Sequence, residues 1–177
     1  MTPIESTKLW INKMVIGLGL CPFASKVVTQ KEIHFSKTKA TDFKSLSALL
    51  NLNAEHILND ENKESTAIIV IEKGLESFLD YLDLIHQLED YLEDVKLNED
   101  IQIASFHPQY QFAETKTTDI TNYTNRSPYP LIHLLKCEDV TAAIESHPDI
   151  HSVPTDNIKK LKSMSLDSLA VVYKSFK

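Results

Sequence analysis

Arginine and glycine are both scarce in this chain. Its 177 residues include one arginine, Arg126, against seventeen lysines, and only three glycines. Gly17, Gly19 and Gly74 cannot form a glycine-rich phosphate loop, which excludes nucleotide binding of the P-loop or Rossmann kind. Since lysine supplies nearly all the positive charge, the lone guanidinium indicates a task that an ammonium does poorly, such as a planar, two-pronged hold on a carboxylate or phosphate. An arginine can equally hold a loop together by capping its carbonyls.

Cysteines, long apolar runs and basic patches are also sparse. The two cysteines, Cys21 and Cys137, match no disulfide framework and no zinc spacing, which agrees with a reducing compartment. The longest apolar runs fall far short of the ~20 residues that span a bilayer, and the N-terminus lacks the layout of a signal peptide. A cluster of three lysines at 159–162 is too small for a phosphate-neutralising surface. We therefore expect a cytoplasmic protein with no membrane segment and no nucleic-acid partner.

The apolar residues that are present recur with helix and strand periods. A capping box of Thr2, Pro3 and Glu5 begins a helix that is expected to run through Leu18. Period-two alternation and β-branched runs predict strands, and 3.6-residue periodicity predicts helices. The expected strands are 32–37, 67–71, 101–106 and 131–136, and the further helices are 22–29, 41–59, an acidic helix over 75–95, 141–146, 157–164 and 166–176.

Helices and strands thus alternate along most of the chain, and no linker is long enough to divide it. A composition of 42% hydrophobic and 24% charged residues is ordinary for a globular domain. Alternation of this kind predicts an α+β or α/β sandwich, with a mixed sheet of four or more strands packed by helices. We expect residues 1–177 to form one such domain.

One connection departs from this regular pattern. The 24 residues from His107 to Pro130 carry four formal charges and many hydroxyls, amides and aromatic rings. Connections longer than about 12 to 15 residues inside compact domains are usually functional loops or disordered, and the aromatic content argues against disorder. Arg126 lies in this loop, among further polar and aromatic candidates for a ligand site: Asn122, Tyr123, Asn125 and Ser127.

Outside the loop centre, Cys21 and three histidines attract attention. Cys21 precedes a proline, so we expect it to cap the helix that begins at 22, where free N–H groups favour a thiolate; a small buried hydrophobe is the equal alternative. His107 ends a strand and opens the loop, a position that often faces a ligand crevice. His133 should lie opposite Ile132 and Leu134, as a core histidine with satisfied hydrogen bonds or a substrate contact. His147 has a second histidine four residues later but no nearby third ligand, so we expect no metal site.

Three segments carry a family resemblance. They are Cys21-Pro22-Phe23-Ala24, then Ala104-Ser105-Phe106-His107-Pro108 with Tyr110-Gln111-Phe112, and finally Asn122-Tyr123-Thr124-Asn125-Arg126-Ser127-Pro128-Tyr129-Pro130-Leu131-Ile132-His133-Leu134-Leu135. Together they resemble the bacterial domain-of-unknown-function family 1415, over essentially the whole chain. This resemblance implies a small cytoplasmic protein of about 180 residues without an assigned activity. Lys136 stands where the family pattern leads us to expect arginine.

A second likeness competes with the first. The run from Val15 to Phe23 looks like the strand-to-helix turn of glutaredoxins, and Pro130 looks like the proline before their late strand. Ala24 replaces the second cysteine, however, and the spacing from Cys21 to Pro130 is about twice that of the fold. A monothiol thioredoxin-like redox protein is therefore kept as a further alternative.

The leading hypothesis is a polar site that binds a small anionic molecule. In it Arg126 holds the anion, Asn122, Asn125 and Ser127 complete the hydrogen bonds, and Tyr123 walls the pocket, with His133 as a further binding residue. If the protein is an enzyme, Cys21 is the nucleophile and His107 its acid or base partner; no cofactor is indicated. The alternative is a non-catalytic sensor or adaptor domain that recognises a metabolite or a protein.

Overall fold

The fold is built on one four-stranded mixed sheet, seen in a computed structural model that describes residues 1–147 and 149–176. The strand order is β1-β2-β4-β3, with β1 parallel to β2 and β4 antiparallel to both of its neighbours. The α+β class and the four predicted strands are confirmed, each boundary within one residue. The strands are β1 (Ile33–Thr38), β2 (Thr66–Ile71), β3 (Ile101–Phe106) and β4 (Leu131–Lys136).

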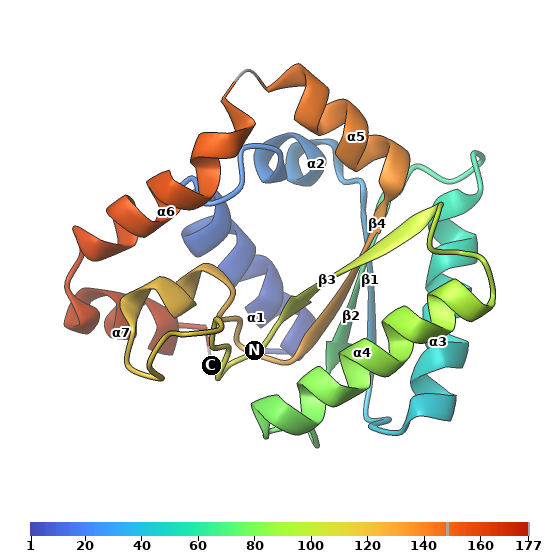
Figure 1. Cartoon of the computed structure of the whole chain (residues 1–177), viewed down its shortest axis with the longest axis horizontal. Helices are drawn as coiled ribbons and strands as arrows, with labels where there is room; N and C mark the ends of the chain where they lie inside the picture. Colours follow the sequence, from blue (N-terminus) through green and yellow to red (C-terminus); the bar gives the residue numbers. More distant parts are fainter. Residues whose placement is uncertain (148, 177) are drawn as a thin grey trace.

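Helices α3 (Phe43–Leu58) and α4 (Phe78–Asp94) cover one face of this sheet (Figure 1). The side chain of Asp42 accepts from Ser45 N at the start of α3, and Ser77 accepts from Asp80 N at the start of α4. The apolar stripes of both helices meet the inward residues of the strands. The fully buried members of this core include Leu46, Leu50, Ile57, Ile69, Ile71, Tyr81, Leu88, Ile132 and Leu134.

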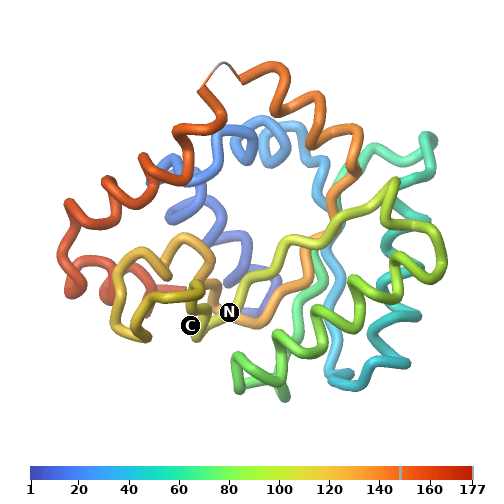
Figure 2. The backbone as a smooth tube through the Cα atoms, viewed as in Figure 1, coloured from blue at the N-terminus to red at the C-terminus, as the bar shows by residue number. Residues whose placement is uncertain are grey.

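A second core fills the space on the opposite face. It is enclosed by α1 (Pro3–Trp10), the π-helical turn η1 (Ile11–Ile16), α6 (Val153–Lys162) and α7 (Leu166–Lys174). Its buried residues include Trp10, Met14, Ile68, Val70, Leu131, Leu161, Leu169 and Phe176. Ser6 Oγ donates to the Phe176 carbonyl, which fixes the last turn of the chain beside its first helix (Figure 2). The predicted sandwich of a mixed sheet packed by helices is therefore confirmed, and the helices lie on both faces.

Two shorter helices complete the fold beside one end of the sheet. They are α2 (Ala24–Gln30) and α5 (Cys137–Ser146), neither of which contains a fully buried residue. The ring of Phe23 contacts that of His147 at 5.8 Å between centroids, which joins the start of α2 to the end of α5. In the described part of the chain, no helix is both long and apolar enough to cross a bilayer.

The first helix ends where glycine permits it. The helical path α1–η1 reaches Gly17, where a Cβ would lie 2.4 Å from the Lys13 carbonyl oxygen, and Gly19 then takes a positive φ of 60°. The predicted capping box is present: Thr2 Oγ1 accepts from Glu5 N at 3.2 Å, and Glu5 Oε2 accepts from Thr2 N at 2.8 Å. Both interactions satisfy N–H groups that the helix itself leaves free.

Thr2→Ala is expected to lower the free energy of unfolding by about 1 kcal/mol, because it removes one half of this capping box. Urea denaturation followed by circular dichroism measures the change. Thr118→Ala is the matched control, since Thr118 is exposed and lies outside any helix. Equal losses in the two variants would show that the capping box contributes nothing to stability.

Candidate functional site

The long connection between β3 and β4 is an ordered loop with its own short 3-10 helix, η2 (Ile120–Thr124). Asp119 begins that helix by accepting from Thr121 N at 2.9 Å and from Thr121 Oγ1 at 2.7 Å. η2 packs against α6, so the loop is part of the second core rather than a free excursion. Its rigidity depends on buried polar side chains.

Asn122 is the centre of this loop and is fully buried. Its Oδ1 accepts from Phe112 N at 3.0 Å and from Thr115 Oγ1 at 2.9 Å, while Nδ2 donates to Lys116 O at 2.8 Å. One side-chain amide thus fixes the return of the chain from Phe112 to Lys116. Asn122, predicted as a ligand contact, has its hydrogen-bonding capacity committed within the loop.

The Arg126 side chain crosses the same loop and donates hydrogen bonds to two of its backbone carbonyls. Nε donates to Tyr110 O at 3.2 Å, Nη2 donates to Thr117 O at 2.6 Å, and the guanidinium carbon lies 5.0 Å from the centroid of the Tyr123 ring. No ion pair joins Arg126 to an acid of the described residues. Its Nη1 makes no hydrogen bond with these residues and is not a buried atom. The guanidinium is therefore held in place, its charge is not neutralised by a carboxylate of the described residues, and its Nη1 is free to donate to a ligand.

His107 is fully buried between the loop and the start of α4. Its Nε2 lies 2.8 Å from Leu75 O, and its Nδ1 accepts from Gln109 N at 3.0 Å, so the proton is assigned to Nε2. The ring packs against Phe78 and Tyr81. Burial lowers the pKa of His107, against the opposing effect of the hydrogen bond to Leu75. Both ring nitrogens are thus engaged with backbone groups.

Three other predicted loop residues lie in the same unit. Asn125 Nδ2 donates to Ser105 O at 3.2 Å, and Asn125 O accepts from His107 N at 3.2 Å. Ser127 is fully buried, and its Oγ donates to Tyr129 O at 2.5 Å. The Tyr123 ring meets that of Tyr173 on α7 edge to face, at 5.7 Å. The structure therefore gathers His107 and residues 122–127 into one hydrogen-bonded loop.

A pocket of about 250 Å³ opens beside this loop, where β2 and β3 end and β4 begins. His107 is not among its lining residues, although its neighbours Pro108 and Gln109 are. The sequence predicts that His107 faces a crevice. In the structure its ring lies behind the residues that line the pocket. The lining residues are Glu72, Lys73, Gly74, Leu75, Glu76, Pro108, Gln109, Pro128, Tyr129 and Pro130.

Cys21 lies in a separate segment that follows Gly19. α6 holds this segment: Asn157 Nδ2 donates to Leu20 O at 2.8 Å, and Lys160 Nζ donates to Leu18 O at 2.5 Å. The cysteine is a partly exposed free thiol. No hydrogen bond, ion pair or ring contact among the described residues links it to His107 or Arg126.

The expected helix-capping position of Cys21 is wrong. A turn over Pro22 and Phe23 intervenes, and α2 starts at Ala24 with Phe23 as its cap residue. The free N–H groups of α2 therefore begin beyond the thiol, and the helix-dipole argument for a thiolate does not apply. The segment before Cys21 is also helical rather than extended, so the glutaredoxin-like strand-to-helix turn is absent there.

His133 lies on β4, on the face opposite Ile132 and Leu134, as predicted. Its Nε2 is 2.7 Å from Thr66 Oγ1, and Thr66 Oγ1 donates to Leu134 O at 2.6 Å. The residue as a whole keeps some exposed surface, and burial of its ring lowers the pKa of His133 to about 4. Sequence reasoning missed Thr66, whose only signal was a hydroxyl residue at the start of a buried strand.

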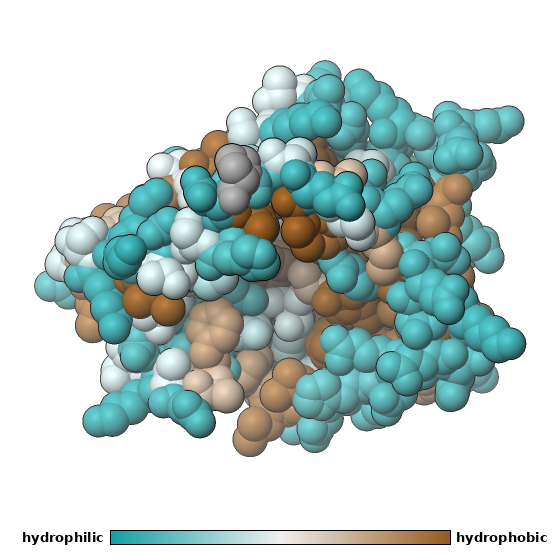
Figure 3. Space-filling view, turned by 45° about the horizontal axis from the view of Figure 1, so that its top comes forward, coloured by the Kyte–Doolittle hydropathy of each residue, from teal (hydrophilic) through white to brown (hydrophobic). Residues whose placement is uncertain are grey.

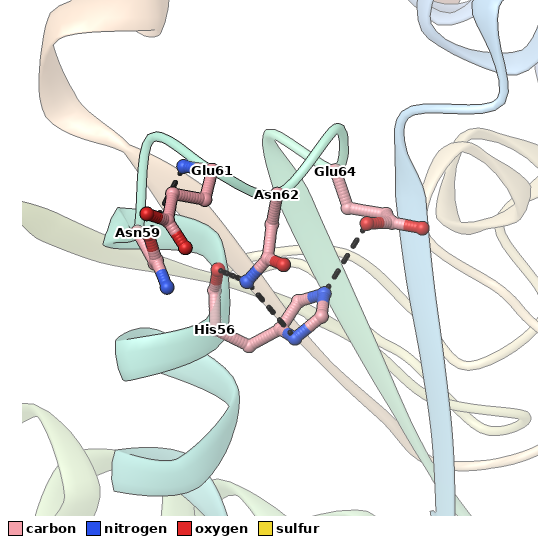
Figure 4. Close-up of polar contacts among 5 residues, drawn as sticks. All are labelled: His56, Asn59, Glu61, Asn62 and Glu64. Carbon is pink, nitrogen blue, oxygen red and sulfur yellow. Dashed lines mark hydrogen bonds and ion pairs between the residues drawn. The ribbon is translucent and has the colours of Figure 1, made fainter.

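A second polar cluster lies at the far end of α3, around His56 (Figure 4). The His56 ring stands between Asn62, whose Nδ2 lies 3.4 Å from Nδ1, and Glu64, whose Oε2 lies 3.3 Å from Nε2. The His34 ring lies against it in a tilted arrangement, with 4.0 Å between the ring centroids. Burial and the nearby His56 lower the pKa of His34, while Glu64 raises it. The described residues include no group of three side chains placed to hold a metal ion.

Glu64→Gln is expected to lower the apparent pKa of His34 further, because it removes a negative charge that favours the protonated ring. Proton NMR titration of the histidine ring signals measures it. Glu61→Gln is the control: Glu61 is exposed in the same loop, and no hydrogen bond or ion pair of the described residues joins its carboxylate to the His56 ring (Figure 4). An unchanged His34 titration in Glu64→Gln would contradict the electrostatic coupling.

Comparison with known proteins gives one match. A family model described as protein of unknown function (DUF1415) matches residues 2–171. A search of curated proteins gives no significant match. A search of solved structures gives none either. The family resemblance noted in the sequence is therefore confirmed over nearly the whole length, and the chain belongs to the family of proteins of unknown function DUF1415.

Proposed function

We propose that the protein is a cytoplasmic binding protein for a small anionic molecule, held by Arg126 on the loop between β3 and β4. The state of that guanidinium is the observation that supports this function most strongly. Two backbone carbonyls and the Tyr123 ring orient it, no carboxylate of the described residues neutralises it, and Nη1 remains open. An oriented cation with unused donors is what a carboxylate or phosphate requires.

The remaining loop residues support this site indirectly. Asn122, Asn125 and Ser127 direct their hydrogen bonds to backbone atoms of the loop and of β3. We infer that they set the position of Arg126 rather than contact the anion, since binding groups need a rigid support to be effective. Tyr123 shields one face of the guanidinium.

A non-catalytic function is favoured over a thiol-dependent reaction. A cysteine nucleophile needs a base within hydrogen-bond reach. Both ring nitrogens of His107 are already engaged with the backbone of Leu75 and Gln109. Cys21 as a nucleophile, with His107 as its partner, stays a prediction from the sequence.

Arg126→Lys should weaken binding of inorganic phosphate or citrate about tenfold, because an ammonium keeps the charge but cannot bond both loop carbonyls and still hold an N–H donor in a fixed direction. Isothermal titration calorimetry of the full chain measures the change. The same variant should also lose some stability, since Tyr110 O and Thr117 O lose their donor.

Two controls separate binding from folding in this experiment. Lys116→Gln removes an exposed positive charge from the same loop and should bind as the wild type does, if the guanidinium is the binding group. Trypsin digestion in the native state reports whether the loop of Arg126→Lys stays folded. Equal phosphate and citrate affinities in wild type and an intact Arg126→Lys would contradict the proposed function.

A further inference from the structure

One end of the sheet is left partly uncovered on the face opposite α3 and α4. Leu131 at the start of β4 is fully buried there, whereas His133 and Leu135 are only partly buried. Their cross-strand partners on β3, Ala104 and Gln102, are also partly exposed. Figure 3 shows this side of the molecule hollowed between the loop and the sheet. A strand in the middle of a sheet is normally covered by packed side chains. β4 has a neighbour on each side, so the uncovered surface beside it is unusual.

The hydrogen bonds of Thr66 fix the tautomer of His133. A threonine hydroxyl has one proton to donate, and the Leu134 carbonyl can only accept. Both contacts of Thr66 Oγ1 are satisfied only if that proton goes to Leu134 O and His133 Nε2–H donates to the hydroxyl. Nδ1 is then the unprotonated nitrogen of a neutral ring.

This Nδ1 has no partner within the described protein. No hydrogen bond of the described residues reaches it, and it is not among the buried atoms that lack one. Its lone pair is therefore accessible from the uncovered side of the sheet. A fixed acceptor with no protein donor is an incomplete hydrogen bond that a ligand can complete.

The surroundings of His133 define the chemistry of such a ligand. The Phe106 ring lies 6.3 Å away between centroids, and Ala104 and Leu135 add apolar surface. Burial shifts the pKa of this ring, and no ion pair of the described residues involves it. An apolar environment without countercharge favours a neutral molecule over an ion.

We propose that the hollow beside β3 and β4 binds a neutral molecule with an O–H or N–H donor on an apolar, preferably aromatic, body, and that the donor bonds to His133 Nδ1. Thr66 acts as a positioning residue, because it holds the proton on Nε2. This site requires no anion and does not depend on Arg126.

Phenol and anisole, which differ by the hydroxyl proton, are the probes. The full chain labelled with ¹⁵N-histidine should show His133 protonated on Nε2 alone at neutral pH. Phenol should shift the His133 Nδ1 resonance in a saturable way, and anisole should not. His133→Gln should weaken phenol binding about fivefold, the effect of one neutral hydrogen bond.

The Thr66 variants test positioning separately from folding. Thr66→Val removes the acceptor for Nε2–H, so the proton should spread to both ring nitrogens and phenol affinity should fall; Thr66→Ser should restore both. A proton on Nδ1 in the wild type, equal shifts with phenol and anisole, or unchanged phenol affinity in Thr66→Val would each overturn the proposal. The Thr66 pair decides the matter even if His133→Gln does not fold.

Discussion

Asn122→Ala is expected to lower the free energy of unfolding by about 3 kcal/mol, among the largest effects of a polar truncation. The side chain is fully buried and makes three hydrogen bonds within the loop. Its removal leaves Phe112 N without a partner, whereas Lys116 O keeps its bond from Asp119 N. Each hydrogen bond lost costs about 1 kcal/mol, and an unsatisfied donor adds to that cost. Chemical denaturation under two-state conditions measures the loss.

The loss of stability in Asn122→Ala should appear first as local opening of the loop. Trypsin should cleave after Lys116 faster in Asn122→Ala than in the wild type, because the loop opens before the rest of the fold. Thr118→Ala, an exposed change two residues from the same lysine, is the control and should digest at the wild-type rate. Loss of stability without faster cleavage would mean that Asn122 stabilises the whole fold rather than the loop.

The sheet could be predicted from the sequence because its signals are local. Alternation in β1 and the β-branched run of β2 report burial within a few residues. The phase of the long acidic helix was less secure. Its apolar residues predict a buried stripe, yet Leu79 is 70% exposed, while Tyr81 is fully buried. The Tyr81 hydroxyl donates to Leu131 O at 2.6 Å and accepts from Phe106 N at 3.1 Å, partners that no sequence pattern reveals.

The ligand site itself stays a prediction, but two local features of the loop agree with the sequence. The aromatic content predicts an ordered loop, and carbonyl capping, one of the two roles expected for Arg126, is present. The burial of His107 depends on Leu75, 32 residues earlier in the chain, and was therefore invisible. The start of α2 was misplaced because proline fits a turn as well as a first helical position.

His133→Gln is expected to make the protein less sensitive to acid. Between pH 7 and about pH 4.5 its free energy of unfolding should fall by about 2 kcal/mol less than that of the wild type. The folded-state pKa of His133 is about 4, below its ordinary value of 6.5. The unfolded chain therefore binds this proton first as the pH falls. Above pH 6.5 the ring is neutral in both states and does not change the free energy of unfolding. Below that pH the unfolded chain is protonated first, so stability is lost progressively toward pH 4. The full linkage value is somewhat larger, but the residue keeps some exposed surface, so the smaller figure is expected.

Glutamine suits this test because its amide can still donate to Thr66 and does not titrate. Urea denaturation at several pH values gives the slope of unfolding free energy for wild type and variant. His34 and His107, whose pKa values are also lowered, are present in both proteins and cancel in the difference. His86→Gln, an exposed change on α4, is the control and should keep the wild-type slope. Parallel slopes for wild type and His133→Gln would mean that the folded protein protonates His133 as readily as the unfolded chain does, and the ring would then be no fixed neutral acceptor.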